Sequence, residues 1–526
     1  MEVASPLTLP ALAGLFFVAS VFLYSRSLAT WQSRSRRLPL PPGPKPLPII
    51  GNMFDWPTRN QWRALRDMST QYGDILHFKV LGQHMVVLGS PEAMFELLEK
   101  RSAHTSDRQQ VPLINLTEMS VNLSVMPYGQ WWRRHKRAFW QHFHPGAIPT
   151  YQPIQRSAAH RFLNKLLKTP SKLREHIRLS VTFSAAVVKV VFGLDVADDG
   201  DEIMTIVEDA LEWIGETFTP GKYLIDVLPI LQHVPTWFPG ATVQRLIVKW
   251  RSTVVRLKEE PYRRVKAAMA RNDAPDSMVS QLITDMVSDG DDLSSKEAET
   301  IIKNVATVAV EGASDTMFST VQTIFVAMSL YPEVQKKAQA ELDAVVGRNR
   351  LPEFEDRHAL VYVNAVIKEA MRWHNVLPFV VPHSTIEDDE YRGYFIPAGT
   401  VLIPNISAYM HDPTVYKDPD VFRPERFIHD GKLDFSTAPD PAKFIFGFGR
   451  RICPGRYFAE NGLFINVASA LHVFDITPPV DEKGQVIKIS PQTTDGLLCY
   501  PTDCRCTIKP RSAQAERLIQ EAQLLH

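Results

Sequence analysis

A helical pattern longer than thirty residues runs through residues 295–329. Ser294 and Glu297 open it with the spacing of a capping box, the arrangement that satisfies backbone N–H groups at a helix start. Further helical patterns occupy most of the chain after about residue 130. They are expected at 130–143, 152–168, 172–193, 200–216, 241–272, 277–288, 332–346 and 357–373. The chain is therefore expected to fold mainly as packed helices.

Strands are expected in two places. The apolar runs 75–80 and 85–88 flank a short Gly-containing turn, which predicts a hairpin, and a helix follows with Ser90 as its N-cap. Residues 394–403 predict a second hairpin within the irregular segment 392–427. The fold class is mainly α with a small β portion, in a single domain that no obvious linker divides.

The long helix carries a cluster of small residues at 312–316. Gly312 loosens the helix ladder there, and Ser314 or Thr316 can compete for a backbone carbonyl. The cluster predicts either a widened groove that faces a ligand or close packing against another helix. Glu311 precedes it and lies about 140° from Thr316 on an ideal helix. It is either a contact for a polar group on a ligand or a structural carboxylate with satisfied hydrogen bonds.

The N-terminal segment has the composition of a membrane anchor. Residues 3–25 carry no charge and residues 7–24 are mostly apolar, which is long enough to cross a bilayer. Basic residues follow this stretch rather than precede it, which argues against a cleaved signal peptide and for a cytosolic body. We expect a transmembrane anchor over 1–26, a basic and Pro-rich linker over 27–51 and a folded domain over 52–526.

A second apolar segment, 217–240, is broken by four prolines and cannot be one helix. It is either a lid or membrane-touching loop, or a connector packed on the core. Both alternatives are compatible with its composition.

Charge and cysteine content exclude some classes of function. Lys plus Arg number 58 and Asp plus Glu number 58, so the formal net charge is zero, which argues against a nucleic-acid partner. Four cysteines in 526 residues do not make a disulfide framework, and a reducing compartment is the simplest inference. Cys504 and Cys506 lack the spacing of common zinc or redox pairs and are expected to be structural.

One cysteine stands in a loop rich in glycine and arginine near the C-terminal end. Residues 446–455 place three glycines and two arginines around Cys453. The glycines let the backbone turn tightly and bring N–H groups to the sulfur, while the arginines supply charge that favours the thiolate. The loop predicts a metal ligand at Cys453.

Two further segments carry paired charges. Glu369 and Arg372 stand three residues apart, on one face of a predicted helix, where they can pair. Arg426 lies in a Pro-Glu-Arg-Phe segment beside aromatic and proline residues. These residues would allow a buried network of one acid and two arginines.

Taken in order, these motifs resemble those of the cytochrome P-450 family. The set comprises the anchor with its proline-rich hinge, Trp132 with Lys136 four residues on, the small-residue-Asp-Thr helix, Glu-x-x-Arg, Pro-Glu-Arg-Phe and a Phe-x-x-Gly-x-Arg-x-Cys-x-Gly loop. The resemblance covers the whole chain. The anchor is similar to that of microsomal members, which implies the endoplasmic reticulum membrane, and Val-Val-Pro-His ending at His383 is similar to fungal members of secondary metabolism.

The resemblance implies a haem b cofactor whose iron is bound by the Cys453 thiolate. Phe446 is implied to pack near the sulfur, Gly449 and Gly455 to permit the loop, and Arg451 to hold a haem propionate. Further propionate contacts are implied for Trp132, Lys136 and His383. Glu369, Arg372 and Arg426 are implied to serve folding rather than catalysis.

The chain departs from the family pattern at two positions. Lys136 stands where an arginine is common, so a point charge replaces a bidentate fork, and the neighbouring Arg137 can take over its role. Ala313 stands where the family has a second glycine, which bears on the width of the oxygen groove. On that face Thr316, with Asp315 behind it, is implied to steady a water that delivers protons to dioxygen.

The same resemblance implies a lipophilic small-molecule substrate and a separate electron donor. The expected donor is NADPH-cytochrome P-450 reductase, with cytochrome b5 as a second one. It would dock on basic residues near the cysteine loop: Arg133, Arg134, Lys136, Arg137, Lys443, Arg450 and Arg456. Substrate is expected to be lined by 105–127, 210–245, 308–312, 376–380 and 494–498, with Leu113, Ile114, Leu116, Val125, Val308, Leu377 and Phe379 as apolar lining.

The function expected is that of a membrane-anchored monooxygenase that hydroxylates or otherwise oxidises a lipophilic metabolite, such as a terpenoid, polyketide, alkaloid or aromatic compound. One alternative is a haem-thiolate isomerase or dehydratase that needs no reductase, and the Asp315 and Thr316 pair argues against it. Another is a non-catalytic haem-binding protein.

Overall fold

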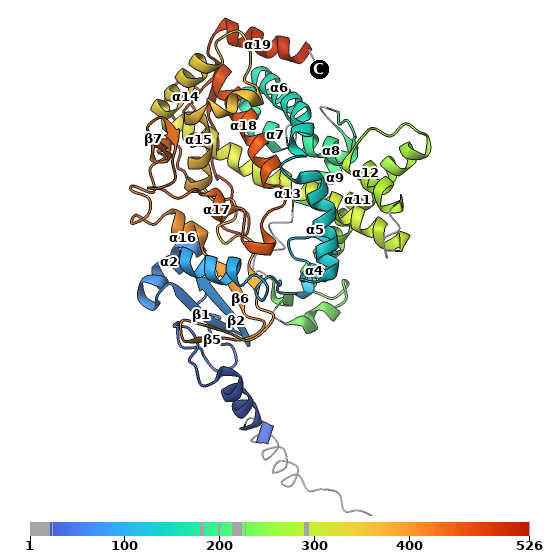
Figure 1. Cartoon of the computed structure of the whole chain (residues 1–526), viewed down its shortest axis with the longest axis vertical. Coiled ribbons are helices and arrows are strands. Elements are labelled where there is room, and N and C mark those ends of the chain that lie inside the picture. Colours follow the sequence, from blue (N-terminus) through green and yellow to red (C-terminus); the bar gives the residue numbers. More distant parts are fainter. Residues whose placement is uncertain are drawn as a thin grey trace, which may run out of the picture.

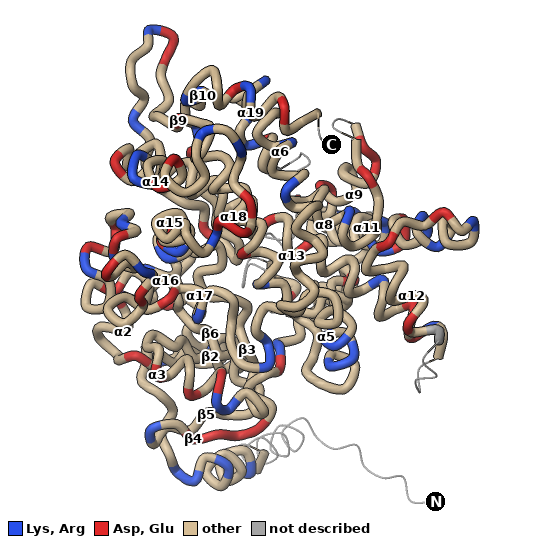
Figure 2. Tube along the Cα trace, turned by 45° about the horizontal axis from the view of Figure 1, so that its top comes forward, with Lys and Arg blue, Asp and Glu red and all other residues tan. Residues whose placement is uncertain are grey.

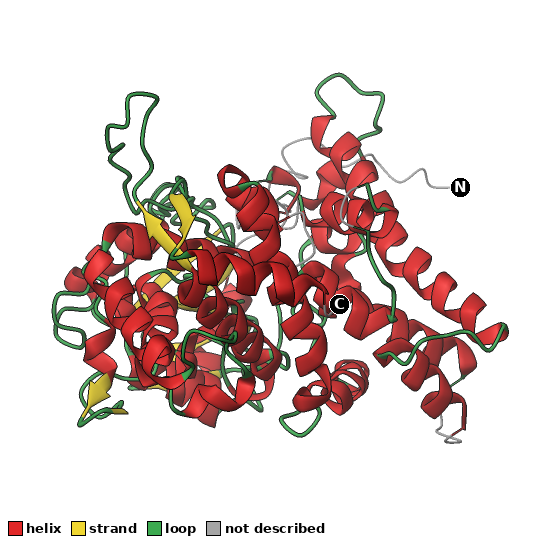
Figure 3. Ribbon diagram, turned by 90° about the horizontal axis from the view of Figure 1, so that it is seen from above, coloured by secondary structure: helices red, strands yellow, loops and turns green. Residues whose placement is uncertain are grey.

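The computed structural model describes residues 22–23, 25–178, 183–197, 200–212, 223–226, 228–288 and 294–524. Helices make up most of the molecule (Figures 1 and 3), and the described strands form four separate small sheets. The expected anchor over 1–26 falls almost entirely outside the described residues. Among those that are described, no helix combines the length and the apolar character needed to span a bilayer.

The helices follow the predicted pattern closely. Two of them, α5 and α6, occupy the predicted ranges to the residue, and the described part of 172–193 holds two helices where one was expected. The helices are α2 (Gln61–Tyr72), α3 (Pro91–Met94), α4 (Pro112–Leu116), α5 (Gln130–Phe143), α6 (Gln152–Lys168), α7 (Leu173–Arg178), α8 (Ser184–Phe192), α9 (Glu202–Leu211), α11 (Thr242–Ala270), α12 (Met278–Ser288), α13 (Ser295–Leu330), α14 (Pro332–Val345), α15 (Val361–Trp373), α16 (Ile406–Met410), α17 (Ala442–Ile445), α18 (Arg456–Val473) and α19 (Ala513–Leu524).

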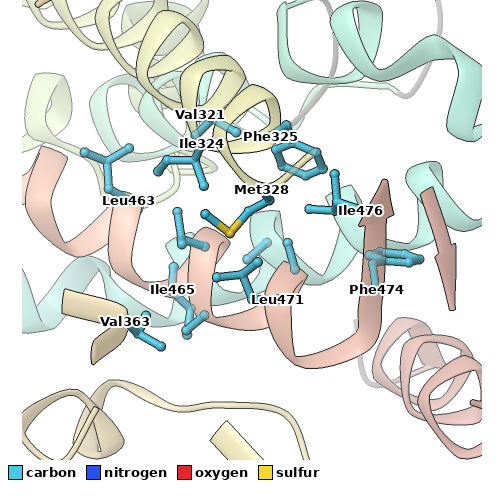
Figure 4. Close-up of a cluster of buried hydrophobic side chains, with 14 of the residues drawn as sticks. Val321, Ile324, Phe325, Met328, Val363, Leu463, Ile465, Leu471, Phe474 and Ile476 are labelled. Atoms are coloured by element: carbon cyan, nitrogen blue, oxygen red, sulfur yellow. The ribbon is translucent and has the colours of Figure 1, made fainter. Parts of the chain in front are cut away.

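The central helix is α13, and it starts at the predicted capping box formed by Ser294 and Glu297. It packs against α5, α8, α12, α15 and α18, so most of its side chains are buried. Figure 4 shows its C-terminal half, where Val321, Phe325 and Met328 face side chains from α18 and the following strand β9 (Phe474–Thr477). The helix therefore forms part of the main core and, in its middle, one wall of a cavity.

The main sheet has four strands in the order β1-β2-β6-β3. The predicted first hairpin is confirmed, because β1 (Ile75–Val80) and β2 (Gln83–Leu88) pair antiparallel. Strand β6 (Val401–Pro404) runs parallel to β2 and antiparallel to β3 (His383–Ser384). The sheet lies at the end of the molecule from which the N-terminal helix leaves (Figure 1).

The predicted hairpin over 394–403 is wrong. Strand β5 (Tyr394–Ile396) pairs with β4 (Asp389–Tyr391), not with β6. Arg392 and Gly393 form the turn between them, with φ of 53° and 79°. Two consecutive left-handed residues match the twist of a tight hairpin, and this turn outweighs the longer apolar run that follows it. The remaining paired strands are β7 (Ile428–His429) with β8 (Lys432–Leu433) and β9 with β10 (Thr507–Pro510).

Part of the expected linker, 27–51, lies on the main sheet. The ring of Trp31 stacks on that of His84, with centroids 5.6 Å apart. Further on, the backbone passes so close to β1 that a Cβ at Gly43 would lie 2.0 Å from the His77 carbonyl oxygen. The proline-rich stretch is therefore packed against the domain.

The described part of 217–240 is divided, because Ile225 is buried in the core at 2% exposure and most of the residues from Leu228 onward are exposed. Ile230 is 76% exposed and Trp237 is 79% exposed, and Phe238 is exposed beside them. The connector alternative therefore holds around Ile225, and an exposed apolar loop follows at 228–240.

The predicted network of one acid and two arginines is confirmed. Glu369 accepts hydrogen bonds from Arg372 at 2.8 and 2.9 Å and from Arg426 at 3.1 and 3.2 Å, and all three side chains are buried. Arg372 also donates to the carbonyls of Met410 and Pro419 at 2.8 Å. The network ties α15 to the segment that leads toward the cysteine loop.

Candidate functional site

A cavity of about 330 Å³ lies between α13, α5 and the loop that precedes α18. The predicted site residues converge on it, although they come from segments more than three hundred residues apart. Those that line it are Trp132, Lys136, Asp315, Thr316, His383, Phe446, Arg451, Cys453 and Gly455. Gly449, the remaining predicted residue, belongs to the same loop but packs against Leu98 and Ser102 rather than lining the cavity.

The cysteine loop is closed by its own backbone. The N–H of Cys453 donates to the carbonyl of Phe446 at 2.7 Å. Gly449 has φ of 53°, and a Cβ there would lie 2.4 Å from the carbonyl oxygen of Leu98. Its N–H donates to the Glu99 carboxylate at 2.5 Å. Glycine is required at this position because both the left-handed backbone and the close approach exclude a side chain.

Opposing effects act on the sulfur of Cys453. Burial raises the pKa of this thiol, while the backbone N–H groups of Gly455 and Arg456 and the charges of Arg456 and Lys136 lower it. Burial is the larger effect. Arg450 and Arg451 were expected to supply the charge that favours the thiolate, but the charges that lower this pKa come from Arg456 and Lys136. A metal cation would supply the charge that holds this sulfur as a thiolate.

Arg451 is buried in the wall of the cavity. Its guanidinium donates to the carbonyls of Ser106 at 2.7 Å, Leu123 at 3.1 Å and Met126 at 2.7 Å. It also lies 4.5 Å from the ring centroid of Trp132. Burial lowers the pKa of Arg451 to about 10. Three of its five N–H groups donate to described residues, and the other two can donate to an acceptor in the cavity.

A second buried arginine, Arg108, was not predicted. It donates to the carbonyls of Ser124, Val381 and Pro382 at 2.6, 3.0 and 2.7 Å. Burial lowers its pKa well below the usual range, and the charge of Arg451 adds to this. Its sequence neighbours offer no periodicity that would single it out, and its carbonyl partners depend on chain contacts far away in sequence.

Lys136 completes a cationic wall with the two arginines, and the neutral ring of His383 lies in the same wall. Burial, followed by repulsion from Arg451, lowers the pKa of Lys136 to about 8. Burial and the charge of Arg108 lower the pKa of His383 well below its usual value. Such an accumulation of positive charge is costly without an anion. The wall fits the two carboxylates of haem b, and Cys453 on the same cavity fits its iron.

The opposite wall is formed by the middle of α13. Thr316 donates to the Gly312 carbonyl at 2.9 Å and Ser314 donates to the Val310 carbonyl at 2.8 Å, as predicted. A Cβ at Gly312 would meet nothing within 4 Å, and Gly312 lines the cavity. The groove is therefore present, and close helix packing is not the reason for this glycine.

Glu311 lines the same cavity and is only 4% exposed. Its Oε2 accepts a hydrogen bond from the Asn122 side-chain amide at 2.8 Å. Among the described residues, Oε1 has no hydrogen-bond partner. The alternative of a fully satisfied structural carboxylate is therefore wrong. Asn122 was not predicted as a site residue, because nothing in its local pattern indicates a partner on α13.

The apolar lining agrees with the sequence only in part. Val308 and Leu377 line the cavity, and so do Leu497 and Leu498 from the predicted turn. The other predicted apolar residues do not line the cavity and pack into hydrophobic clusters instead: Leu113, Ile114, Leu116, Val125 and Phe379. Most of these residues lie in one loop that folds back on the core. No periodic pattern in the sequence predicts this packing. Part of 210–245 lies outside the described residues.

Comparisons with known proteins agree with this site. A model of the family "Cytochrome P450" matches residues 41–502. The chain is 39% identical to cytochrome P450 monooxygenase COX2 of Coprinopsis cinerea, over 93% of this chain and 92% of that protein. It is 38% identical to cytochrome P450 monooxygenase 208 of Postia placenta, over 95% and 96%. It is 35% identical to cytochrome P450 monooxygenase claR of Ampulloclitocybe clavipes, over 92% and 89%.

Proposed function

This chain belongs to the cytochrome P450 family, and from that premise we propose that it oxidises a lipophilic small molecule with dioxygen and with electrons from a separate NADPH-dependent reductase. It is a haem-thiolate monooxygenase with haem b as its cofactor. Bound haem supplies the activation of dioxygen. The observation that carries the proposal is that Cys453 and Thr316, from separate elements, line one cavity.

The residues of α13 are suited to proton delivery. The Thr316 hydroxyl donates its proton to the Gly312 carbonyl, which leaves its oxygen free to accept a hydrogen bond from a water. Asp315 is buried next to it and lines the same cavity. Thr316 is therefore proposed to hold a water in the groove at Gly312, and Asp315 to supply its proton.

The substrate is proposed to be an apolar compound of fungal secondary metabolism, such as a terpenoid, polyketide, alkaloid or aromatic compound. Val308, Leu377 and Leu498 line the cavity and favour burial of apolar surface. The relatives named above are fungal monooxygenases, which supports this class.

The electron donor is proposed to bind beside the cysteine loop. Arg133, Lys136, Arg137 and Arg456 surround a shallow depression that Ile452 and Pro454 of the loop also line. Figure 2 shows the basic residues of α5 as a blue segment. Such a surface suits an acidic flavoprotein such as NADPH-cytochrome P450 reductase, and cytochrome b5 would use the same charges.

The proposed location is the endoplasmic reticulum membrane, with the catalytic domain in the cytosol. Exposed apolar side chains support a contact with lipid, among them Ile49 at 91% and Phe54 at 79% exposure, together with Ile230 and Trp237. These residues come from the segment before β1 and from the exposed loop described above.

The test is reconstitution of the haem-loaded protein with a purified reductase, followed by product analysis of a library of lipophilic metabolites. Product that requires both NADPH and dioxygen is expected. Turnover of a substrate without NADPH would instead support the isomerase or dehydratase alternative, and a haem-thiolate spectrum without any turnover would support a binding protein.

A further inference from the structure

Glu311 and Asn122 form a polar pair in the wall of the substrate cavity. Both side chains are buried, at 4% and 8% exposure, and both line the cavity. The side-chain carbonyl of Asn122 accepts hydrogen bonds from the N–H of Ser124 at 2.9 Å and from its hydroxyl at 2.7 Å. The amide group of Asn122 must then point its NH2 at Glu311, so the orientation of the pair is fixed by the loop.

This orientation assigns different roles to the two carboxyl oxygens. Oε2 accepts the hydrogen bond from Asn122 at 2.8 Å. Oε1 has no hydrogen-bond partner among the described residues, and a buried polar atom in that condition is costly. Burial raises the pKa of Glu311 to about 8, and the neighbouring Asp315 adds to this. Near neutral pH the side chain is therefore mainly a neutral acid whose proton resides on Oε1, where it can be donated.

The neutral form of Glu311 bears on the choice of ligand as well. Arg108, Lys136 and Arg451 also line the cavity, but their charges are assigned to the haem carboxylates. A neutral acid offers no counter-charge to a cationic ligand, whereas a neutral oxygen atom can accept the Oε1 proton without any ion pair. On a helix, Glu311 stands about 7–8 Å along the axis from Thr316, so an anchored oxygen would hold the molecule at a set distance from the oxygen groove.

We propose that Glu311, oriented by Asn122, donates a hydrogen bond from Oε1 to the substrate, and that the substrate is a neutral, largely apolar molecule with a ketone or hydroxyl oxygen. This assignment rests on the monooxygenase function proposed above and adds a polar recognition point to its cavity.

The experiment compares probes that share one hydrocarbon cage: adamantane, adamantanol, adamantanone and the trimethyladamantylammonium cation, which cannot bind iron. Their dissociation constants are measured at neutral pH from the shift of the haem absorption band of the holoprotein. Glu311→Leu should weaken adamantanone and adamantanol by about 3- to 10-fold, the value of one hydrogen bond, and leave adamantane unchanged. Glu311→Gln should stay within about 2-fold for all neutral probes, because its NH2 can donate in place of the acid.

Val308→Ala is the matched control. Val308 lines the cavity from the same helix but offers only apolar contact. Its truncation should weaken adamantane and adamantanone to the same extent. The proposal is overturned if Glu311→Leu affects adamantane and adamantanone equally, or if the ammonium probe binds most tightly and loses its affinity in Glu311→Gln.

Infrared difference spectra provide a second measurement that does not depend on the leucine variant folding. The wild-type protein should show a protonated carboxyl band that is absent from Glu311→Gln. Adamantanone should shift this band and adamantane should not; a band that ignores adamantanone overturns the proposal. Failure of the monooxygenase function would look different, because the reduced protein would then lack the carbon monoxide band of a haem thiolate, or NADPH-dependent turnover would be absent.

Discussion

Arg451 and Trp132 share one hydrogen-bond acceptor, the backbone carbonyl of Leu123. The guanidinium donates to it at 3.1 Å and the indole N–H at 3.2 Å, with the guanidinium carbon 4.5 Å from the ring centroid. One carbonyl oxygen therefore links three parts of the chain: the cysteine loop, helix α5 and the loop that precedes α5. The cationic wall of the cavity depends on this contact.

Replacement of Arg451 should lower haem content. Arg451→Leu removes three buried hydrogen bonds and one cation from the wall. Arg451→Lys keeps the charge but loses the planar guanidinium that donates several hydrogen bonds at once. We expect severe loss of haem in the first variant and partial loss in the second, measured as haem absorbance per protein. Arg450→Ala is the control, because Arg450 is exposed and should leave haem content unchanged. Equal loss in both positions would contradict the assignment.

Thr316→Ala should uncouple electron use from product formation. The variant removes the hydroxyl that is proposed to hold a water at the Gly312 groove. NADPH consumption should continue while the product formed per NADPH falls severalfold, with peroxide as the balance. Thr316→Ser restores the hydroxyl and should restore much of the coupling. Coupling that is the same in wild type and Thr316→Ala would remove Thr316 from this role.

The network at Glu369 should govern stability rather than chemistry. Glu369→Leu leaves two buried arginines without their shared carboxylate, which costs about 3–5 kcal/mol in free energy of unfolding. Denaturant unfolding should show that loss, together with poor haem retention. The exposed pair of Arg66 and Asp67 is the control, and Asp67→Ala should change the same free energy by only about 0–1 kcal/mol.

Gly449→Ala should disrupt the cysteine loop. The added Cβ would lie 2.4 Å from the Leu98 carbonyl oxygen, at a residue whose φ is already 53°. We expect little folded, haem-bearing protein from this variant. Gly431 has a similar φ of 70° but open space around it, so Gly431→Ala should cost only about 1 kcal/mol. If thermal unfolding shows equal effects at the two glycines, the close approach at Gly449 is not the cause.

Glu311 should make stability depend on pH in a predictable direction. Burial raises its pKa from 4.5 to about 8, so between these values the folded protein binds more protons here than the unfolded chain. Stability contributed by the neutral acid is then lost as pH rises through this window, by at most about 1.4 kcal/mol per pH unit. Glu311→Gln has no carboxyl group to titrate. Its free energy of unfolding in urea should therefore rise relative to that of the wild type as pH increases from 5 toward 8. A constant difference would show that Glu311 ionises normally.

Much of the helical fold was predictable because long amphipathic patterns and caps are local signals. Residues of α5 and α6 show this, as does the start of α13 at Ser294. The motif residues around Cys453, Thr316 and Trp132 could also be placed in one site by resemblance, and they line one cavity.

Other features depend on contacts between distant segments and leave no local pattern. Arg108 meets the carbonyl of Val381, and Asn122 meets Glu311, across separations of 273 and 189 residues. The charges that act on Cys453 also differ from those expected, because they come from Arg456 and Lys136 and not from Arg450 and Arg451. The hairpin predicted over 394–403 was wrong because the two-residue turn at Arg392 and Gly393 pairs β5 with β4, although a longer apolar run follows.

The packing of residues 31–43 on the main sheet has a practical consequence for the boundary of the catalytic unit. Trp31 rests on His84 and on Phe395, and Arg34 pairs with Asp388 at 2.6 Å. A chain shortened to start at residue 52 would strip these partners away and lay bare the ring of Phe395 and the edge of β1. A truncated version intended for crystallisation or for soluble expression should therefore begin before Trp31. Part of the basic and Pro-rich segment that was expected to be a linker packs on the folded domain.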